Sequence, residues 1–230
     1  MQAGVTAKKP NGRGRMMTAL TMEEIIRYAK ECFSTARGSH DWDHTERVYR
    51  LCIHIGQVEG ADLEVLAVAA YLHDAGRIYE DESQGTVCHA EKGAEIAKTL
   101  LVNYPLSEQK KRNLVHCIQS HRFRGNRAPE TLEARVLFDA DKLDSIGAIG
   151  IGRAFLFAGE VGAKLHNPEA DLHKTRPYTA EDTAYREFKL KLSKIRDRML
   201  TAEGRRMAEA RHAFMESFFE RLQQEYEGRK

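Results

Sequence analysis

Apolar residues recur three and four positions apart along most of this chain, a spacing typical of amphipathic helices. Thr21 and Glu24 form a capping box before the first such stretch, and Asp62 is placed to cap the third. Gly60 and Gly76 are placed to end the second and third helices. Helices are therefore predicted over residues 22–33, 43–59, 63–75, 90–101, 107–119 and 132–144, with one or two long helices between 179 and 227.

Strand patterns are absent from the sequence: no segment alternates apolar and polar residues with a period of two. The pattern therefore predicts an all-α fold. A glycine- and alanine-rich stretch, residues 146–162, favours close helix packing or a tight turn near a site. The first 18 residues are basic and have no period, so we expect a disordered leader or tag-like extension (1–18) before a single domain (19–230).

Composition narrows the class of protein. Hydrophobic residues make up 42% and charged residues 30% of the chain, as in ordinary soluble domains. No apolar run approaches the roughly 18 residues that span a bilayer, so no membrane insertion is expected. The four cysteines are scattered without a CxxC pair, which favours reduced thiols and a cytoplasmic location. A net charge of +2 provides no overall field for nucleic acid, which we do not expect as a partner.

Four polar residues stand in apolar surroundings. His44 lies on the inward face of the second helix, His73 and Asp74 are adjacent at the end of the third, and Asp141 lies far downstream. Buried imidazole and carboxylate groups are costly unless something binds them. Neighbours on a helix point about 100° apart, so His73 and Asp74 can reach two sides of one ion. Such nitrogen and oxygen donors suit Mn, Fe, Co, Ni or Zn better than Mg or Ca.

The order of these residues resembles a known pattern. The segments "SHDWDHTERV", "YLHDAG", "SHRF" and "DADKLDSIGAIGIGRAF" are similar to the H…HD…D signature of the HD-domain superfamily of metal-dependent phosphohydrolases. Residues 187–222 resemble the C-terminal segment of small, stand-alone bacterial members, so the similarity covers roughly residues 20–228. The resemblance implies an HD-domain helical bundle with long C-terminal helices. It also implies hydrolysis of nucleotide phosphates, with nucleoside triphosphate pyrophosphohydrolase as one known activity.

Carried over residue by residue, the resemblance implies the metal ligands His44, His73, Asp74 and Asp141. We expect one divalent transition-metal ion, with manganese among the candidates and two ions as the alternative. A bound divalent ion lowers the pKa of water toward about 7 and withdraws charge from a phosphoryl oxygen. Asp74 and His121 are the candidate catalytic groups.

Basic residues near the proposed ligands are candidates for binding substrate phosphates. Arg47 lies one turn after His44, and Lys142 is next to Asp141. The loop "RFRGNR" contributes Arg122 and Arg124. The alternatives are a salt-bridged or exposed surface position for Arg47 and Lys142, and a solvated turn for the loop.

Further histidines and acids extend the candidate site. His89, His116 and His121 lie between the HD pair and Asp141, where they could complete a second metal shell, bind phosphate or act as a general acid. For His116 we favour a core position. For His121 we favour substrate contact. For His89 we favour a surface position at a helix N-terminus. Asp144 is placed to orient a ligand histidine by accepting a hydrogen bond from the ring nitrogen that does not bind the metal. Asp81 and Glu82 are available as a base or supporting acids, in a segment that reads as a loop.

The preferred hypothesis is a metal-dependent phosphohydrolase that acts on a nucleotide or another small phosphorylated metabolite through a metal-activated water. One alternative is a di-iron oxygenase of the HD fold. Another is a non-catalytic, metal-containing sensor or nucleic-acid-binding module. Large apolar residues of the last helix are expected to pack across the domain or in a homodimer; they are Met207, Phe214, Met215, Phe218 and Phe219.

Overall fold

The computed structural model describes residues 19–33, 42–122 and 127–230, and within these ranges all regular secondary structure is helical, which confirms the all-α prediction. The predicted leader, residues 1–18, lies outside the described residues. The α-helices are α1 (Met22–Cys32), α2 (Trp42–Glu59), α3 (Leu63–Leu72), α4 (Arg77–Glu82), α5 (His89–Leu101), α6 (Glu108–Ser120), α7 (Leu132–Leu143), α8 (Gly147–Glu160), α9 (Ala184–Leu190) and α10 (Ala202–Tyr226), with 3₁₀ turns at Leu172–Lys174, Leu192–Lys194 and Arg196–Arg198.

The predicted helix signals act as expected at the first three helices. The Thr21 hydroxyl accepts from the Glu24 N–H at 3.3 Å and the Glu24 carboxylate accepts from the Thr21 N–H at 3.0 Å, which completes the capping box of α1. Asp62 caps α3 by accepting from two backbone N–H groups. Gly60 follows α2 with φ +76°, a conformation that favours glycine.

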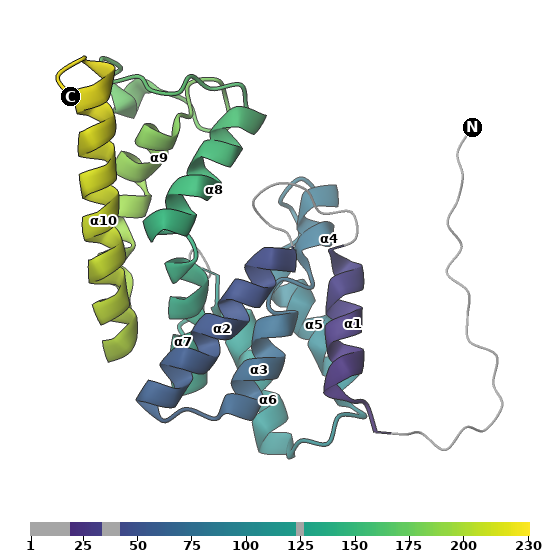
Figure 1. Cartoon of the computed structure of the whole chain (residues 1–230). Helices are drawn as coiled ribbons and strands as arrows, with labels where there is room; N and C mark the ends of the chain where they lie inside the picture. The colour runs from purple at the N-terminus through teal and green to yellow at the C-terminus, as the bar shows by residue number, and fades with distance from the viewer. Residues whose placement is uncertain (1–18, 34–41, 123–126) are drawn as a thin grey trace, which may run out of the picture.

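Helix α3 is the centre of the larger helical group, α1–α7 (Figure 1). Nearly all of its side chains are buried, and it packs against α1, α2, α6 and α7. A helix that is apolar on all sides is stable only when neighbours cover it completely. Each fully buried leucine, such as Leu66 and Leu72, contributes about 1.5–3 kcal/mol. His73 and Asp74, which directly follow α3, therefore lie in the interior of the protein.

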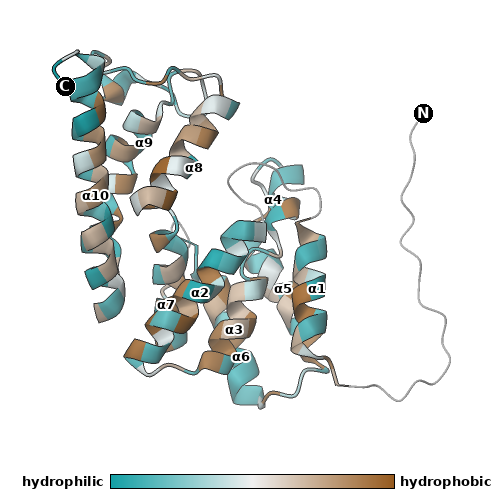
Figure 2. Ribbon diagram, viewed as in Figure 1, coloured by the Kyte–Doolittle hydropathy of each residue, from teal (hydrophilic) through white to brown (hydrophobic). Residues whose placement is uncertain are grey.

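Helices α8, α9 and α10 stand together beside this group (Figure 1), and α10 also packs against α7 and α2. In Figure 2, α8 is mostly brown and white, whereas α10 carries teal along much of its length. Met215 and Phe219 of α10 are buried, and the Phe219 ring stacks on that of Phe188 in α9, with 4.6 Å between the ring centroids. Phe214, in contrast, is 51% exposed. The apolar face of α10 thus packs largely within the chain.

A buried carboxylate fastens α10 to α7. Asp139 accepts from the Thr201 N–H at 2.8 Å, from the Thr201 hydroxyl at 2.6 Å and from the Leu200 N–H at 2.9 Å. A Cβ at Gly204 would lie 2.3 Å from Oδ2 of Asp139, so glycine is required there for the close approach. The helix that carries Asp141 and Asp144 is therefore held from its other side by the start of α10.

Two predicted boundaries are wrong. Helix α3 ends at Leu72, before Gly76, and the His73 ring donates to the Ala70 carbonyl oxygen in its last turn. The segment after Gly76 is the short helix α4, where the sequence suggested a loop. Gly76 instead allows close packing on α5, since a Cβ there would lie 2.3 Å from the His89 carbonyl oxygen. Among the described helices, none combines the length and apolar character needed to cross a bilayer.

Candidate metal centre

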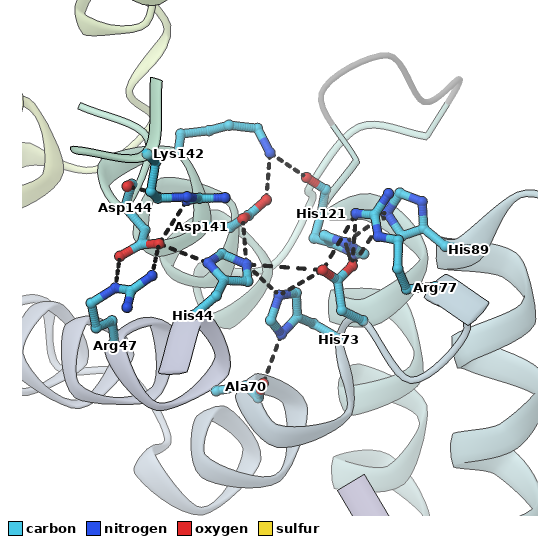
Figure 3. A network of polar contacts seen from close by, with 12 residues as sticks. His44, Arg47, Ala70, His73, Arg77, His89, His121, Asp141, Lys142 and Asp144 are labelled. Carbon is cyan, nitrogen blue, oxygen red and sulfur yellow. Dashed lines mark hydrogen bonds and ion pairs between the residues drawn. The ribbon is translucent and has the colours of Figure 1, made fainter. Parts of the chain in front are cut away.

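The candidate centre lies where the ends of five helices meet (Figure 3). His73 and His121 directly follow α3 and α6 as their C-caps, and Asp144 follows α7 in the same way. His44 lies in the first turn of α2, and His89 is the first residue of α5. All five side chains are buried. Residues up to 100 positions apart in the sequence are thereby brought into one polar cluster inside an apolar core.

Two of the rings are fixed by backbone carbonyls of their own helices. His73 Nδ1 lies 2.7 Å from the Ala70 oxygen, and His121 Nδ1 lies 2.6 Å from the Ile118 oxygen. A carbonyl oxygen can only accept, so Nδ1 donates in both contacts. In a neutral imidazole, Nε2 is then the acceptor, with its lone pair directed away from the helix.

The other two rings are fixed by carboxylates. His44 Nδ1 lies 2.7 Å from Oδ2 of Asp144, and His89 Nδ1 contacts the Glu80 carboxylate. Metal-binding histidines commonly donate their remaining N–H to a carboxylate or carbonyl, which fixes the tautomer and the ring orientation. All four imidazoles therefore present Nε2 to the centre.

Nε2 of His44 and Nε2 of His73 lie 3.3 Å apart, and the former lies 3.4 Å from Oδ1 of Asp141. Oδ2 of Asp74 lies 3.9 and 3.7 Å from the same two nitrogens. We call these four residues the first donor set. They are the predicted ligands, and the structure brings all four together.

A second donor set lies beside the first. Nε2 of His89 and Nε2 of His121 are 3.2 Å apart, and Oδ1 of Asp74 lies 3.5 and 3.6 Å from them. Asp74 therefore directs one carboxylate oxygen to each set, as a bridging ligand does. His89, Asp74 and His121 have ligand atoms close enough together to hold an ion of their own.

The donor chemistry fits a cation at the first set. Burial lowers the pKa of His73 to about 4, so this ring is neutral near pH 7, and it also lowers the pKa of His89, in the second set, to about 3. Burial also acts to lower the pKa of His44, but hydrogen bonds to Asp141 and Asp144 outweigh it and raise the pKa. The site therefore attracts positive charge. Ligands about 2.0–2.1 Å from a tetrahedral zinc ion lie about 3.3–3.4 Å apart, close to the separations seen here.

Comparison with known proteins agrees with this geometry. The HD domain family model matches residues 41–146. The uncharacterised protein YpgQ of Bacillus subtilis (strain 168) is 34% identical over 210 residues, which is 90% of this chain and 94% of YpgQ. The chain belongs to the HD superfamily of hydrolases.

Solved HD structures have the same fold. The crystal structure of B. subtilis YpgQ in complex with ADP matches this HD protein with a TM-score of 0.69 and 29% identity, over 90% of this chain and 99% of that one. A predicted HD-superfamily hydrolase from an uncultured Thermotogales bacterium matches with a TM-score of 0.65 and 29% identity, over 89% and 92% of the two chains.

The position of His89 in this HD domain differs from the sequence prediction. It is 5% exposed and lies in the second donor set, so the predicted surface position is wrong. His89 is spaced four residues before Gly93 and eight before Ala97, both buried, and this spacing was the available signal. His121 is also buried in this set.

Two charged residues that support the centre were not predicted from the sequence, Glu80 and Arg153. Asp81 and Glu82, the acids expected in this segment, are both exposed, whereas the buried Glu80 holds His89. Arg153 of α8 was also missed, although its Nη1 lies 2.7 Å from Oδ2 of Asp144. Neither contact has a sequence signal, because the partners come from separate helices.

The predicted phosphate-binding cations surround the centre. Arg47 contacts Asp144 through Nε at 2.6 Å and Nη2 at 3.0 Å. Lys142 Nζ lies 2.5 Å from Oδ2 of Asp141, and Arg122 Nη2 lies 2.8 Å from Oε1 of Glu80. All three side chains are partly exposed. Arg124 lies outside the described residues.

Proposed function

We propose that this HD hydrolase is a metal-dependent phosphohydrolase that cleaves nucleotides, with nucleoside triphosphate pyrophosphohydrolysis as the favoured reaction. The observation that carries the proposal is the convergence of fixed Nε2 lone pairs and two carboxylates on one point. The nucleotide class is supported by YpgQ, which was crystallised with ADP. The surrounding cations suit a polyanionic substrate.

In this proposal His44, His73, Asp74 and Asp141 hold one divalent transition-metal ion. When bound, such an ion activates a water as the nucleophile and withdraws charge from a phosphoryl oxygen. Asp144 keeps the His44 proton on Nδ1, and the Ala70 carbonyl does the same for His73. The protein thus keeps two lone pairs directed at the ion and requires no rearrangement to bind it.

The substrate phosphates are bound by Lys142, Arg47 and Arg122 in this proposal. Each of these cations is held by a carboxylate, so its charge is fixed in place before the substrate arrives. Preorganised charges of this kind stabilise developing negative charge without a cost of reorientation. The same cations would orient the chain of phosphates relative to the attacking water.

Both candidate catalytic groups, the Asp74 carboxylate and the His121 imidazole, are able to accept a proton. Burial acts to raise the pKa of Asp74, but the Arg77 guanidinium and His73 outweigh it, and the pKa lies well below its usual range. Asp74 therefore stays ionised and serves as a ligand or proton acceptor. His121 donates through Nδ1, so its Nε2 is also an acceptor. Proton acceptance from the attacking water is the role that fits both.

The test uses the full chain, stripped of metal and reloaded separately with Mn, Fe, Co, Ni or Zn. Each form is assayed against nucleoside mono-, di- and triphosphates, with separate detection of phosphate and pyrophosphate. Pyrophosphate release from triphosphates, dependent on metal, is the expected result. Absence of any phosphate or pyrophosphate release with every metal would refute the proposal.

Two histidines of α2 provide a matched pair of variants. His44→Gln removes a proposed ligand, and should abolish metal binding and hydrolysis. His54→Gln replaces a half-exposed ring outside the donor sets, whose Nε2 lies 2.7 Å from Oε1 of Glu203. This variant should retain metal binding and hydrolysis. Oxygen consumption by the iron-loaded protein, without phosphate release, would instead support the oxygenase alternative.

A further inference from the structure

The Arg77 guanidinium lies against the second donor set. Its Nη2 is 3.1 Å from Oδ1 and 3.3 Å from Oδ2 of Asp74, and 3.4 Å from Nε2 of His89. Nη1 lies 3.0 Å from Oε2 of Glu80. Two of the three donors that could hold a second ion are thus already in contact with a positively charged nitrogen of the chain itself (Figure 3).

The charge on Arg77 is permanent. A guanidinium group keeps its proton throughout the physiological pH range, and Arg77 contacts two carboxylates, Asp74 and Glu80. Arginine also contacts Asp74 through a nitrogen that cannot give up its proton, so no change near neutral pH removes the charge. Arg77 therefore behaves as a fixed cation.

Charge around the second donor set is balanced without a metal ion. The two carboxylates that contact it, Asp74 and Glu80, already face two guanidinium groups, those of Arg77 and Arg122. A divalent ion at this set would add positive charge beside Arg77, which is unfavourable in a buried site. The first donor set also has a neighbouring cation, Lys142, but Lys142 contacts Oδ2 of Asp141, whereas Oδ1 of Asp141 faces Nε2 of His44.

We infer that Arg77 takes the place of a second metal ion, so that this chain holds one divalent ion at the first donor set and a guanidinium at the second. The inference rests on the proposed function, since it takes the first set as the metal site. The two donor sets share Asp74, and Nη2 of Arg77 lies 3.1 Å from Oδ1, which faces the second set, and 3.3 Å from Oδ2, which faces the first. Arg77 then provides the second positive charge beside the substrate without being lost by dissociation.

The experiment counts metal ions instead of measuring turnover. Metal-free wild type, Arg77→Gln and Arg77→Lys are titrated with Mn²⁺, and bound manganese is measured by calorimetry and by elemental analysis after desalting. Wild type and Arg77→Lys should bind one ion per chain. Arg77→Gln should bind two, because loss of a neighbouring like charge should strengthen the second site by about 10- to 1,000-fold.

Arg122→Gln is the matched control. It removes the same charge from the same Glu80, but Arg122 contacts Glu80 and Cys88 and its hydrogen bonds do not reach Asp74. It should bind one ion. Circular dichroism of each variant checks that the fold is retained.

Two outcomes would overturn the inference: two ions of similar affinity in wild type, or a single ion in folded Arg77→Gln. Neither outcome would contradict the proposed phosphohydrolase activity. Failure of the wild type to bind manganese or any other transition metal would remove the proposed function together with the inference, so the two failures are distinguishable.

Discussion

Replacing Asp144 with asparagine tests how the centre is built. Asp144 is 1% exposed and accepts from His44, Arg47 and Arg153. Burial acts to raise its pKa, but His44 and Arg47 outweigh burial and hold the pKa below its usual range. Asparagine keeps the shape and one acceptor oxygen but removes the charge. The variant therefore leaves two guanidinium groups and one imidazole without their common carboxylate.

Two effects of Asp144→Asn can be estimated. Removing one partner from a buried charge network costs about 3–5 kcal/mol. The lower end, about 3 kcal/mol, is expected because the Arg47 and Arg153 side chains are 28% and 16% exposed and retain some hydration. Loss of the group that orients His44 should weaken metal binding by about 10- to 100-fold.

Stability is measured by urea unfolding of the metal-free protein, and affinity by calorimetric titration with Mn²⁺. Because the folded-state pKa of Asp144 is lowered, its stabilisation is present above the ordinary value near 4 and is lost on acidification below it. The difference in stability between wild type and variant should therefore shrink below about pH 4.

Asp139→Asn is the control, because Asp139 is also buried on α7 but contacts Leu200 and Thr201 instead of a donor histidine. It should lose about 1–3 kcal/mol of stability through unpaired donors and keep the wild-type metal affinity. If Asp144→Asn binds manganese as tightly as Asp139→Asn does, the argument that Asp144 orients a ligand is wrong.

Three further predictions concern pH, packing and substrate binding. The free energy of unfolding of the metal-free protein should fall by about 2 kcal/mol per histidine between pH 6.5 and 5, as measured by urea unfolding. The pKa values of His73 and His89 are lowered to about 4 and about 3, so on acidification these histidines take up protons first in the unfolded chain. A free energy of unfolding that does not change over this pH range would contradict the prediction. Gly76→Ala should lower the stability of the protein by about 1–3 kcal/mol in thermal melts, because the new Cβ would lie 2.3 Å from the His89 carbonyl oxygen. Gly159→Ala is the control: no atom lies within 4 Å of its Cβ position, so the variant should be as stable as the wild type or slightly more stable. Lys142→Met should lower kcat/KM for a nucleoside triphosphate by about 10- to 100-fold; an unchanged value would exclude Lys142 from phosphate binding.

The helices and the first donor set could be predicted because their signals are local or ordered along the chain. Thr21, Asp62 and Gly60 mark helix ends by their own chemistry. His44 lies on the inward face of a periodic helix, and His73 directly follows α3, which is apolar on nearly all sides, so the burial of both could be predicted from the sequence. Both residues could therefore be placed in the interior before any coordinates were available.

The second donor set could not be predicted in the same way. Helix α4 has only six residues, too few to show a helical period, so Glu80 could not be recognised as an inward residue. Without Glu80, the sequence marks His89 as inward only through its spacing to Gly93 and Ala97, two small residues that give a weak signal of burial. The role of Arg77 depends on contacts among three separate elements, which spacing along a chain does not reveal.

His73 and His121 each donate from Nδ1 to a carbonyl oxygen three residues earlier in the preceding helix, so one hydrogen bond at the helix end fixes the direction of the ring. Ring orientation is therefore decided upstream of the loop that follows. One residue inserted within α3 or α6 would turn the histidine that follows by about 100°, away from the centre. The length of each helix is therefore under the same constraint as the identity of the histidine that follows it.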